Sequence, residues 1–397
     1  MTKGWEIRPL GEVCEIRSGG TPSKSKAEYW GAGIPWVSPK DMKTSVVSDS
    51  IDHITATAVT EGAARLVPVG SLLVVVRSGI LARTIPVART AATVAVNQDI
   101  KALIPSATVQ PEYLQYLLGS MEPSLLKSVT RGATVHRLET PVLQRLPIPI
   151  PPLAEQERIV RILDTALGWT RAVSDVLRAE KVDYGLLFDS ALNRLTTPRA
   201  DWTASTIGGE THFIDYRGKT PPKSDAGIPL ITAKNIRMGY LRAEPREYID
   251  SALYQDWMRR GIPRKGDVLF TTEAPLANVA QLDTSDPVAL AQRVIVMQTD
   301  PARLNPGLLK YLLLSSTVQS KIRDHGTGAT ATGIKASLLR TIPIHFPPRT
   351  SDQKDIVNTL DRLSAQVTSL DKTLSKRTSA VDNLRESLLH QAFTGQL

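Results

Sequence analysis

The sequence is short of the residues that build disulfide-linked or metal-binding proteins. Cys14 is the only cysteine among 397 residues, which excludes an internal disulfide and a cysteine-rich zinc site. The six histidines are scattered, and no two of them have the helical spacing of metal ligands. We therefore predict no metal site.

Long hydrophobic runs are also missing. The longest uncharged apolar run, residues 72–76, is far too short to cross a bilayer, and residues 1–5 lack the character of a signal peptide. These absences predict a cytoplasmic protein without a membrane partner.

Catalytic motifs are equally scarce. No glycine-rich dinucleotide fingerprint follows a strand-like run, and no nucleophile elbow is present. Residues 218–220 (GKT) resemble the end of a phosphate-binding loop, but Phe213 stands where its first glycine should be, so a turn is the better interpretation. The loop carboxylates Asp41, Asp99 and Glu273 are better read as solvated or turn-forming groups. We predict no catalytic residue and no cofactor bound by the chain.

Basic residues exceed acidic ones. Lysine and arginine total 48 against 39 aspartates and glutamates, which gives a formal net charge of +9. Such an excess favours a polyanionic partner, although many basic proteins bind none. A chain of this length can hold two or three ordinary domains with their own cores.

A repeated segment organises the chain. Residues 132–152 align without a gap with residues 328–348, and each copy ends in a proline pair. Proline cannot continue a helix and biases the preceding residue towards extended geometry. Each proline pair therefore predicts a stop followed by the start of a new helix.

A long amphipathic helix is predicted after each proline pair. Apolar residues recur there at steps of three and four, with the same phase in both copies. Such a seam needs a partner helix, so we expect the two helices, each about 40 residues long, to pair with each other. Two unrelated core helices are the alternative. The seam residues are Ile159, Leu163, Ala166, Val173, Leu177, Tyr184, Leu187 and Ala191 in the first copy, and Ile356, Leu360, Leu363, Val367, Leu370, Leu374, Val381, Leu384 and Leu388 in the second.

The repeat extends into the segments that precede the helices. GIPWVSPKD at residues 33–41 is echoed by GIPLITAKN at residues 227–235. Short apolar runs bounded by Gly, Pro, Ser and Asp predict strands, and Pro111 and Pro306 suit the starts of short helices. We predict an α+β fold of two tandem modules, each followed by a long helix. The expected boundaries are 1–152 for the first module, 153–196 for the first helix, 197–348 for the second module and 349–397 for the second helix.

The polar loops differ in sequence between the two modules, whereas the apolar segments that flank the loops are similar. Two related recognition modules with different targets would show this pattern, as would drift of unselected surface loops. Cations in these loops can meet phosphates and other side chains can read base edges, with a solvated surface role as the alternative for each. The candidate phosphate contacts are Lys24, Lys26, Lys40, Lys43, Arg217, Lys219, Lys223, Lys234 and Arg237. The candidate base contacts are Arg77, Arg83, Asn97, Gln98, Asn235, Gln292 and Arg293.

The helix starts and the C-terminal segment carry a family resemblance. Two half-chain repeats, with IPIPPLAEQERIVRILD in the first, IPIHFPPRTSDQKDIVNTLD in the second and LLHQAFTGQL at residues 388–397, resemble the specificity subunit of type I restriction-modification systems. The resemblance covers the entire chain. The second copy departs from the family pattern, because residues 349–353 lack the usual Leu and Glu and Ala291 replaces the Asn of the Asn-Gln pair.

The resemblance implies a division of labour. Each module would be a target recognition domain that reads one half of a split double-stranded DNA sequence, and the two helices would form an antiparallel coiled coil that spaces the modules. Two methyltransferase subunits would bind along the helices and supply the S-adenosylmethionine chemistry, and a translocating restriction subunit can join. We place the subunit contacts at Glu155, Gln156, Arg158, Arg161 and Gln353.

We therefore predict a sequence-specific DNA-recognition subunit without catalytic activity of its own. A DNA-modifying enzyme with its own active site and a coiled-coil arm is the alternative from another class, but it needs a cofactor or metal motif. A coiled-coil scaffold with carbohydrate- or peptide-binding modules is a third possibility.

Overall fold

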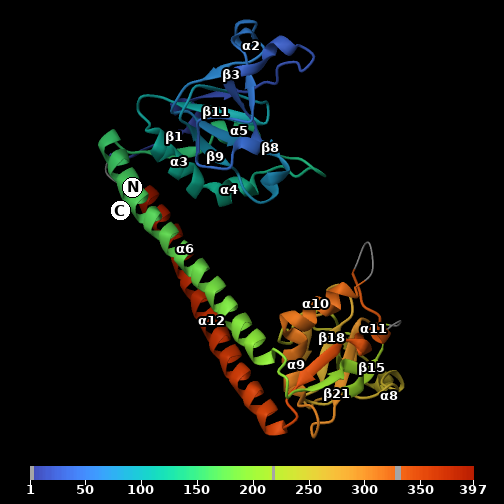
Figure 1. Cartoon of the computed structure of the whole chain (residues 1–397). Helices are drawn as coiled ribbons and strands as arrows, with labels where there is room; N and C mark the ends of the chain where they lie inside the picture. Colours follow the sequence, from blue (N-terminus) through green and yellow to red (C-terminus); the bar gives the residue numbers. More distant parts are fainter. Residues whose placement is uncertain (1–3, 217–219, 327–331) are drawn as a thin grey trace. The chain divides into compact units, whose positions relative to one another are not determined.

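A computed structural model describes residues 4–216, 220–326 and 332–397 (Figure 1). Its internal contacts divide the chain into two compact units. The first unit comprises residues 1–177 and 376–397, and the second comprises residues 178–375. Each unit thus combines one module with a segment of both long helices.

Two sheets form the body of the first module. The larger sheet has the order β2 (Cys14–Ser18), β11 (Ile100–Pro105), β7 (Leu72–Val75), β9 (Val87–Thr90) and β4 (Val46–Val47). The smaller sheet has the order β5 (Asp52–Ile54), β3 (Trp30–Val37), β10 (Val94–Val96) and β6 (Leu66–Val67). Every residue of β7 is buried, as expected for an apolar run in the middle of a sheet.

Short helices and connections complete the first module. Pro111 begins α3 (Pro111–Ser120), where the missing N–H of proline leaves no hydrogen bond unmade, and α4 (Glu122–Lys127) follows it. The remaining elements are α1 (Leu10–Val13), α2 (Ala56–Thr60), α5 (Thr140–Gln144), η1 (Ala27–Tyr29), η2 (Pro39–Asp41), η3 (Gly79–Ala82), β8 (Arg77–Ser78) and β12 (His136–Arg137).

The second module repeats this plan. One sheet has the order β15 (Thr211–Asp215), β21 (Val294–Thr299), β18 (Val268–Thr271) and β19 (Val279–Gln281), and the other has β17 (Tyr248–Ile249), β16 (Ile228–Ile231) and β20 (Ala289–Leu290). Its helices are α7 (Ile207–Glu210), η4 (Ser251–Leu253), α8 (Tyr254–Trp257), α9 (Pro306–Leu314), α10 (Ser316–Asp324) and α11 (Ala336–Thr341). Pro306 begins α9, as predicted.

Each module is closed by a pair of antiparallel strands from its two ends. In the first, β1 (Glu6–Pro9) pairs with β13 (Pro147–Ile150). In the second, β14 (Thr203–Thr206) pairs with β22 (Pro343–Phe346). The proline-rich strands stand in two-stranded sheets, where a missing N–H donor is tolerated. The chain therefore leaves each module beside the point where it entered, and the long helix begins there.

The long helices are α6 (Leu153–Thr196, 44 residues) and α12 (Thr350–Thr394, 45 residues). In the first unit the Arg158 guanidinium, near the start of α6, donates to the carbonyl of Leu397 at 2.7 Å. In the second unit Lys181 of α6 lies 2.7 Å from Asp371 of α12. The start of one helix thus meets the end of the other, so the helices run antiparallel. The predicted α+β fold with two modules and paired long helices is confirmed.

The predicted seam was wrong at four positions. Val173, Leu187, Leu370 and Leu384 are exposed, whereas the neighbouring Ser174, Phe188 and Asp371 are half-buried. At the first three positions the half-buried residue is the next one along the helix, so the buried stripe there lies one residue later than the seam predicts. A two-helix pair buries only a narrow stripe, so such residues remain on the surface. None of the helices in the described ranges has the length and hydropathy needed to cross a membrane.

Candidate nucleic-acid interface

A polar edge lies beyond the central strands of the first module. The N–H of Val76 donates to the carbonyl of Asp99 at 2.8 Å, which brings the end of β7 beside the start of β11. At this edge the Arg77 Nε donates to the Asp99 carboxylate, with side chains that are 37% and 22% exposed. Both partners can therefore be reached by a ligand.

The second module has the same edge with the charges exchanged. The N–H of Thr272 donates to the carbonyl of Arg293 at 3.0 Å, and the Nε of Arg293 lies 2.7 Å from Oε1 of Glu273. Arg77 and Glu273 each stand two residues after their strand, β7 or β18. Asp99 and Arg293 each stand directly before theirs, β11 or β21. Each position thus carries an arginine in one module and a carboxylate in the other.

Two of the predicted base contacts, Asn97 and Asn235, are wrong because their side chains are buried inside turns. Asn97 is 6% exposed, and its amide is hydrogen-bonded to the carboxylate and the N–H of Asp99 at 3.1 and 3.0 Å. Asn235 is 7% exposed, and its amide bonds the backbone of Thr232, Arg242 and Pro245. Neither side chain is free to reach a base. Asn97 instead shapes the turn before Asp99, and Asn235 shapes the loop that follows β16. Asparagine is typical of such turns.

Three of the predicted phosphate contacts are paired with nearby groups. Lys26 donates to the Tyr29 hydroxyl at 2.8 Å and lies 3.3 Å from Glu61; the Tyr29 bond, then the Glu61 bond, raises the pKa of Lys26. Lys40 lies 2.8 Å from Asp52, whose hydrogen bond raises the Lys40 pKa. These two ammonium groups therefore stay charged. Lys223 lies 2.8 Å from Glu247.

The other candidates differ in exposure. Lys24, Lys43, Arg83, Lys234 and Gln98 are exposed, and Arg237 and Gln292 are half-buried. The side-chain oxygen of Gln98 accepts a hydrogen bond from the Thr21 hydroxyl. Arg217 and Lys219 lie outside the described residues.

The start of α6 carries three of the predicted subunit contacts. Arg158 binds Glu155 through Nε and Nη2 at 2.7 and 2.8 Å, and this bond lowers the pKa of Glu155. Arg161 is exposed and lines a shallow surface depression together with Arg158, Ile162 and Trp169. The Trp169 side chain is 73% exposed. The sequence pattern missed Trp169, although a tryptophan off the helix seam was the available signal.

The predicted subunit contacts Gln156 and Gln353 are wrong, because both side chains are fully buried. The Gln156 amide donates to the carbonyls of Thr108 and Pro151 and accepts from the N–H of Gln110 at 2.8 Å. Gln353 does the same with Arg303, Pro347 and the N–H of Asn305 at 2.7 Å. Each glutamine therefore joins its long helix to the loop before α3 or α9.

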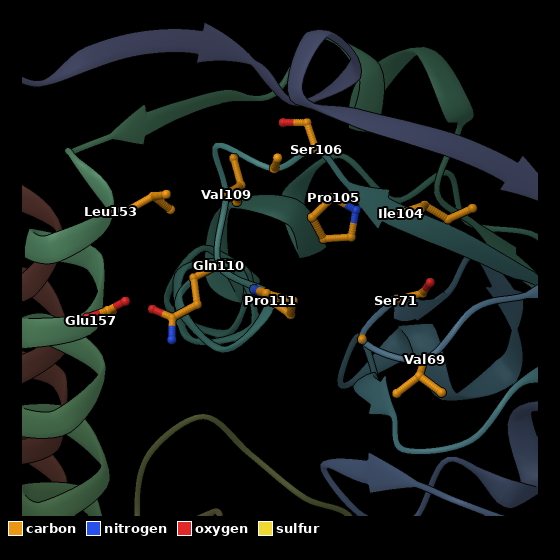
Figure 2. Close-up of a pocket in the computed structure, with 12 residues that line it drawn as sticks. Val69, Ser71, Ile104, Pro105, Ser106, Val109, Gln110, Pro111, Leu153 and Glu157 are labelled. Carbon is orange, nitrogen blue, oxygen red and sulfur yellow. The ribbon is translucent and has the colours of Figure 1, made fainter.

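A small cavity adjoins the first of these junctions. It has a volume of about 360 Å³ and lies between the loop before α3, the end of β11 and the first turn of α6 (Figure 2). Its lining combines apolar side chains, among them Ile104, Val109 and Leu153, with polar groups, and Glu157 is its one ionisable side chain. The side-chain oxygen of Gln110 is buried without a hydrogen-bond partner. Glu157 therefore has no ionisable partner among the residues that line the cavity.

The Asp41 carboxylate and the Cys14 thiol have roles or surroundings that serve the fold. Asp41 accepts from the N–H and the hydroxyl of Ser38 in a capping box, at 2.9 and 2.8 Å. Burial raises the pKa of the Cys14 thiol to about 12, which keeps it protonated and unreactive. Across the residues that the structure describes, no three His, Cys, Asp or Glu side chains are grouped to hold a metal.

Comparison with known proteins gives a consistent result. The family model for the type I restriction modification DNA specificity domain matches residues 2–172 and again residues 201–377. The specificity subunit of the Escherichia coli enzyme EcoR124I/EcoR124II is 38% identical over 177 residues, which is 44% of each chain. The MjaIX specificity subunit of Methanocaldococcus jannaschii is 33% identical over 167 residues, 41% of this chain and 38% of that protein. Both alignments thus span less than half of the relative.

Solved structures share the fold over the whole length. A chain from a study of complex assembly and conformational transition in the type I restriction-modification system superposes with a TM-score of 0.74 at 19% identity, covering 100% of this chain and 99% of that one. The crystal structure of the HsdS subunit from Thermoanaerobacter tengcongensis gives a TM-score of 0.58 at 19% identity, covering 100% and 98%. At this identity the likeness establishes the fold alone.

Proposed function

The chain belongs to the type I restriction modification DNA specificity domain family, and on that premise we propose that it is the DNA-recognition subunit of a type I restriction-modification complex. In this proposal residues 1–152 read one half of a split DNA sequence and residues 197–348 read the other half. The chain performs no chemistry itself. Since its substrate would be DNA, its place of action would be the cytoplasm.

One observation carries the proposal: the modules share a backbone frame but present different polar side chains at the same edge. The bonds from Val76 to Asp99 and from Thr272 to Arg293 fix that frame in each module. Direct readout depends on donors and acceptors placed by a rigid scaffold, so an exchange of side chains on an unchanged frame changes the bases read. Readers of two different half-sites would have this property.

Non-specific affinity would come from the loop cations. Exposed lysines such as Lys24, Lys43 and Lys234 can meet phosphates directly, whereas Lys223 pairs with Glu247, whose side chain is only 15% exposed. The ion-paired Lys26 and Lys40 can exchange their exposed carboxylate partners for phosphates. Exposed ion pairs contribute little to stability, so this exchange costs little. Each phosphate contact releases counterions, and the affinity of the chain for DNA would therefore fall steeply with salt.

The long helices would set the gap between the half-sites. Helices of 44 and 45 residues extend roughly 65 Å at 1.5 Å per residue. On this basis the half-sites would lie roughly one to two turns of B-DNA apart.

Two methyltransferase subunits would dock on the helix faces and bring S-adenosylmethionine, and a restriction subunit could join that complex. The exposed Arg161 and the Glu155–Arg158 pair are the contacts that we propose for them. The relatives described above are named as specificity subunits of type I restriction enzymes, which supports the proposal that this chain joins such a complex.

A methylome of the host with and without this gene tests the proposal. The intact host should methylate a bipartite sequence with an unread gap, and the deletion should abolish methylation of that sequence alone. Restoring the gene should restore it. An unchanged methylome would contradict the proposed function.

A further inference from the structure

Two arginines, one in each module, hold a carboxylate in a way that leaves part of the guanidinium unused. Asp99 accepts from the Nε of Arg77, and the Glu273 carboxylate likewise faces the Nε of Arg293. No group in the described ranges accepts a hydrogen bond from the terminal nitrogens Nη1 and Nη2 of either arginine. A guanidinium has five N–H donors, so both terminal NH₂ groups remain for a ligand.

Pairing through Nε is not confined to this edge, because Arg8 and Arg246 also meet a carboxylate through Nε. Two other arginines use more of the guanidinium. Arg303 places both Nε and Nη2 on Glu210, at 3.1 and 3.0 Å. Arg17 likewise uses Nε and Nη2 on Glu15, at 3.0 and 2.7 Å, and gives Nη1 to the carbonyl of Leu66. Arg17 thus uses all three of its guanidinium nitrogens within the protein, and Arg303 uses two.

Backbone strain gathers at the same edge of the second module. Among the described residues other than glycine, only Ala274, Ala277 and Arg293 have positive φ, with values of 45°, 66° and 74°. Side chains disfavour this conformation, which persists where the surrounding structure imposes it and is frequent at ligand-binding sites. Ala274 and Ala277 lie in the loop that carries Glu273, and Arg293 supplies its partner, so the strain bears directly on the ion pair.

The pair adds little to stability, because its side chains are between 22% and 46% exposed and exposed ion pairs are weak. The two copies nonetheless both keep an arginine and a carboxylate here, although each position carries the opposite charge. Both modules therefore have an arginine at this edge that a carboxylate orients. The position that carries the positive charge differs between them.

We propose that Arg77 and Arg293 each read a guanine in the major groove through their Nη edge, and that Asp99 and Glu273 are positioning residues that hold the guanidinium plane. Bidentate contact with guanine O6 and N7 is the commonest specific use of arginine. Because the arginine stands after the strand in one module and before the strand in the other, the guanine falls at different places in the two half-sites. This inference rests on the proposed function.

The test is the methylated sequence in the host carrying single variants of the full chain. Arg77→Ala should relax one G·C position in a single half-site, with a loss of discrimination of roughly 5- to 150-fold. Arg77→Lys, which keeps the charge and favours folding, should relax the same position because lysine lacks the planar fork. Asp99→Asn should relax the same G·C position too, whereas Asp99→Glu, which keeps the carboxylate, should leave that position specific. Arg293→Ala should act on the other half-site.

Exchanging the two charges distinguishes an arginine that reads a base from an arginine that only forms a structural ion pair. The double variant R77E/D99R places the residue types of the second module at these two positions, so a structural role predicts the native methylated sequence, whereas a reading role predicts a changed or lost half-site. Arg8→Ala is the matched control, because Arg8 pairs with Glu12 through Nε at 3.4 Å and should leave the sequence unchanged. Restoration by the exchange, or weaker methylation with every base still required in Arg77→Ala, would overturn the inference. Absence of any bipartite methylation in the wild type would contradict the proposed function instead.

Discussion

The side-chain oxygen of Gln156 accepts a hydrogen bond from the backbone N–H of Gln110 at 2.8 Å, and this bond joins the first turn of α6 to the start of α3. Gln353 and Asn305 form the equivalent bond in the second unit, at 2.7 Å. A module that reads DNA at a set distance must be fixed firmly to its spacer helix. These two buried amides provide that fixation in each half of the chain.

Gln156→Leu should destabilise the first unit. Leucine has nearly the same volume but leaves the N–H of Gln110 and the carbonyl of Thr108 without partners, which costs about 1–3 kcal/mol in the free energy of unfolding. Urea unfolding of the purified chain measures the loss. Glu157→Leu, at the next helix position, is the control and should change the midpoint little. Equal midpoints for Gln156→Leu and the wild type would show that the amide does not hold the junction.

An exchange of cap residues should move stability in opposite directions. Asn305 caps α9 by accepting from the N–H groups of Gly307 and Leu308, whereas Gln110 makes no such bond to α3 although its backbone angles are similar. Gln110→Asn should therefore stabilise α3 by about 0.5–1 kcal/mol, and Asn305→Gln should cost a similar amount. Thermal melting of both variants measures the difference. A loss of stability in Gln110→Asn would mean that the cavity wall, rather than the cap, dominates at this position.

Acid should weaken one ion pair of the second module. Glu210 is 8% exposed, and hydrogen bonds, first from Arg303 and then from Ser205, hold its pKa below the usual range against the effect of burial. A carboxylate whose folded pKa is depressed stabilises the fold above its unfolded pKa, near about 4.3, and loses that contribution as the pH falls through the folded pKa. The stability difference between the wild type and Glu210→Gln should therefore be largest at neutral pH and shrink below about pH 4.

Urea unfolding across that pH range measures the difference. Glu244→Gln is the control, because Glu244 and its partner Arg246 are both more than 60% exposed. A difference for Glu210→Gln that stays constant with pH would exclude the carboxylate charge as its cause.

Lengthening both helices should lengthen the unread gap. Seven residues inserted into α6 within residues 161–182, and seven into α12 within residues 358–379, add two turns and keep the phase of the seam. The added helix is roughly 10 Å long, or about three base pairs at 3.4 Å each. The methylated sequence should keep both half-sites and gain that many unread positions. An insertion in α6 alone should break the pairing and abolish methylation, and an unchanged gap after both insertions would contradict the spacer role.

The repeat made the architecture predictable from the sequence. Proline pairs mark the helix starts and Pro111 and Pro306 mark short helices, because proline constrains the backbone wherever it stands. The phase of the seam was less certain, since Leu187 and Phe188 are adjacent and only packing decides which one is buried. Local sequence patterns specify where the helices begin, and tertiary contacts decide which of two adjacent apolar residues is buried.

The candidate site was less predictable. Arg77 and Asp99 are 22 positions apart and meet only because β7 and β11 pair, so the charge exchange with Glu273 and Arg293 emerges from the strand register. Gln156 looked like a surface residue because glutamine is usually exposed, yet the start of its helix is covered by the loop before α3. Burial of a polar side chain follows from the partners that the fold supplies.

Replacing residues 1–152 by the corresponding module of a relative, and then sequencing the methylated sites of the host, tests most directly whether each module reads one half-site. The account predicts that one half of the bipartite sequence changes to that of the donor, while the other half and the gap stay as they were. If both halves change together, or neither does, the modules are not independent readers and the account is contradicted.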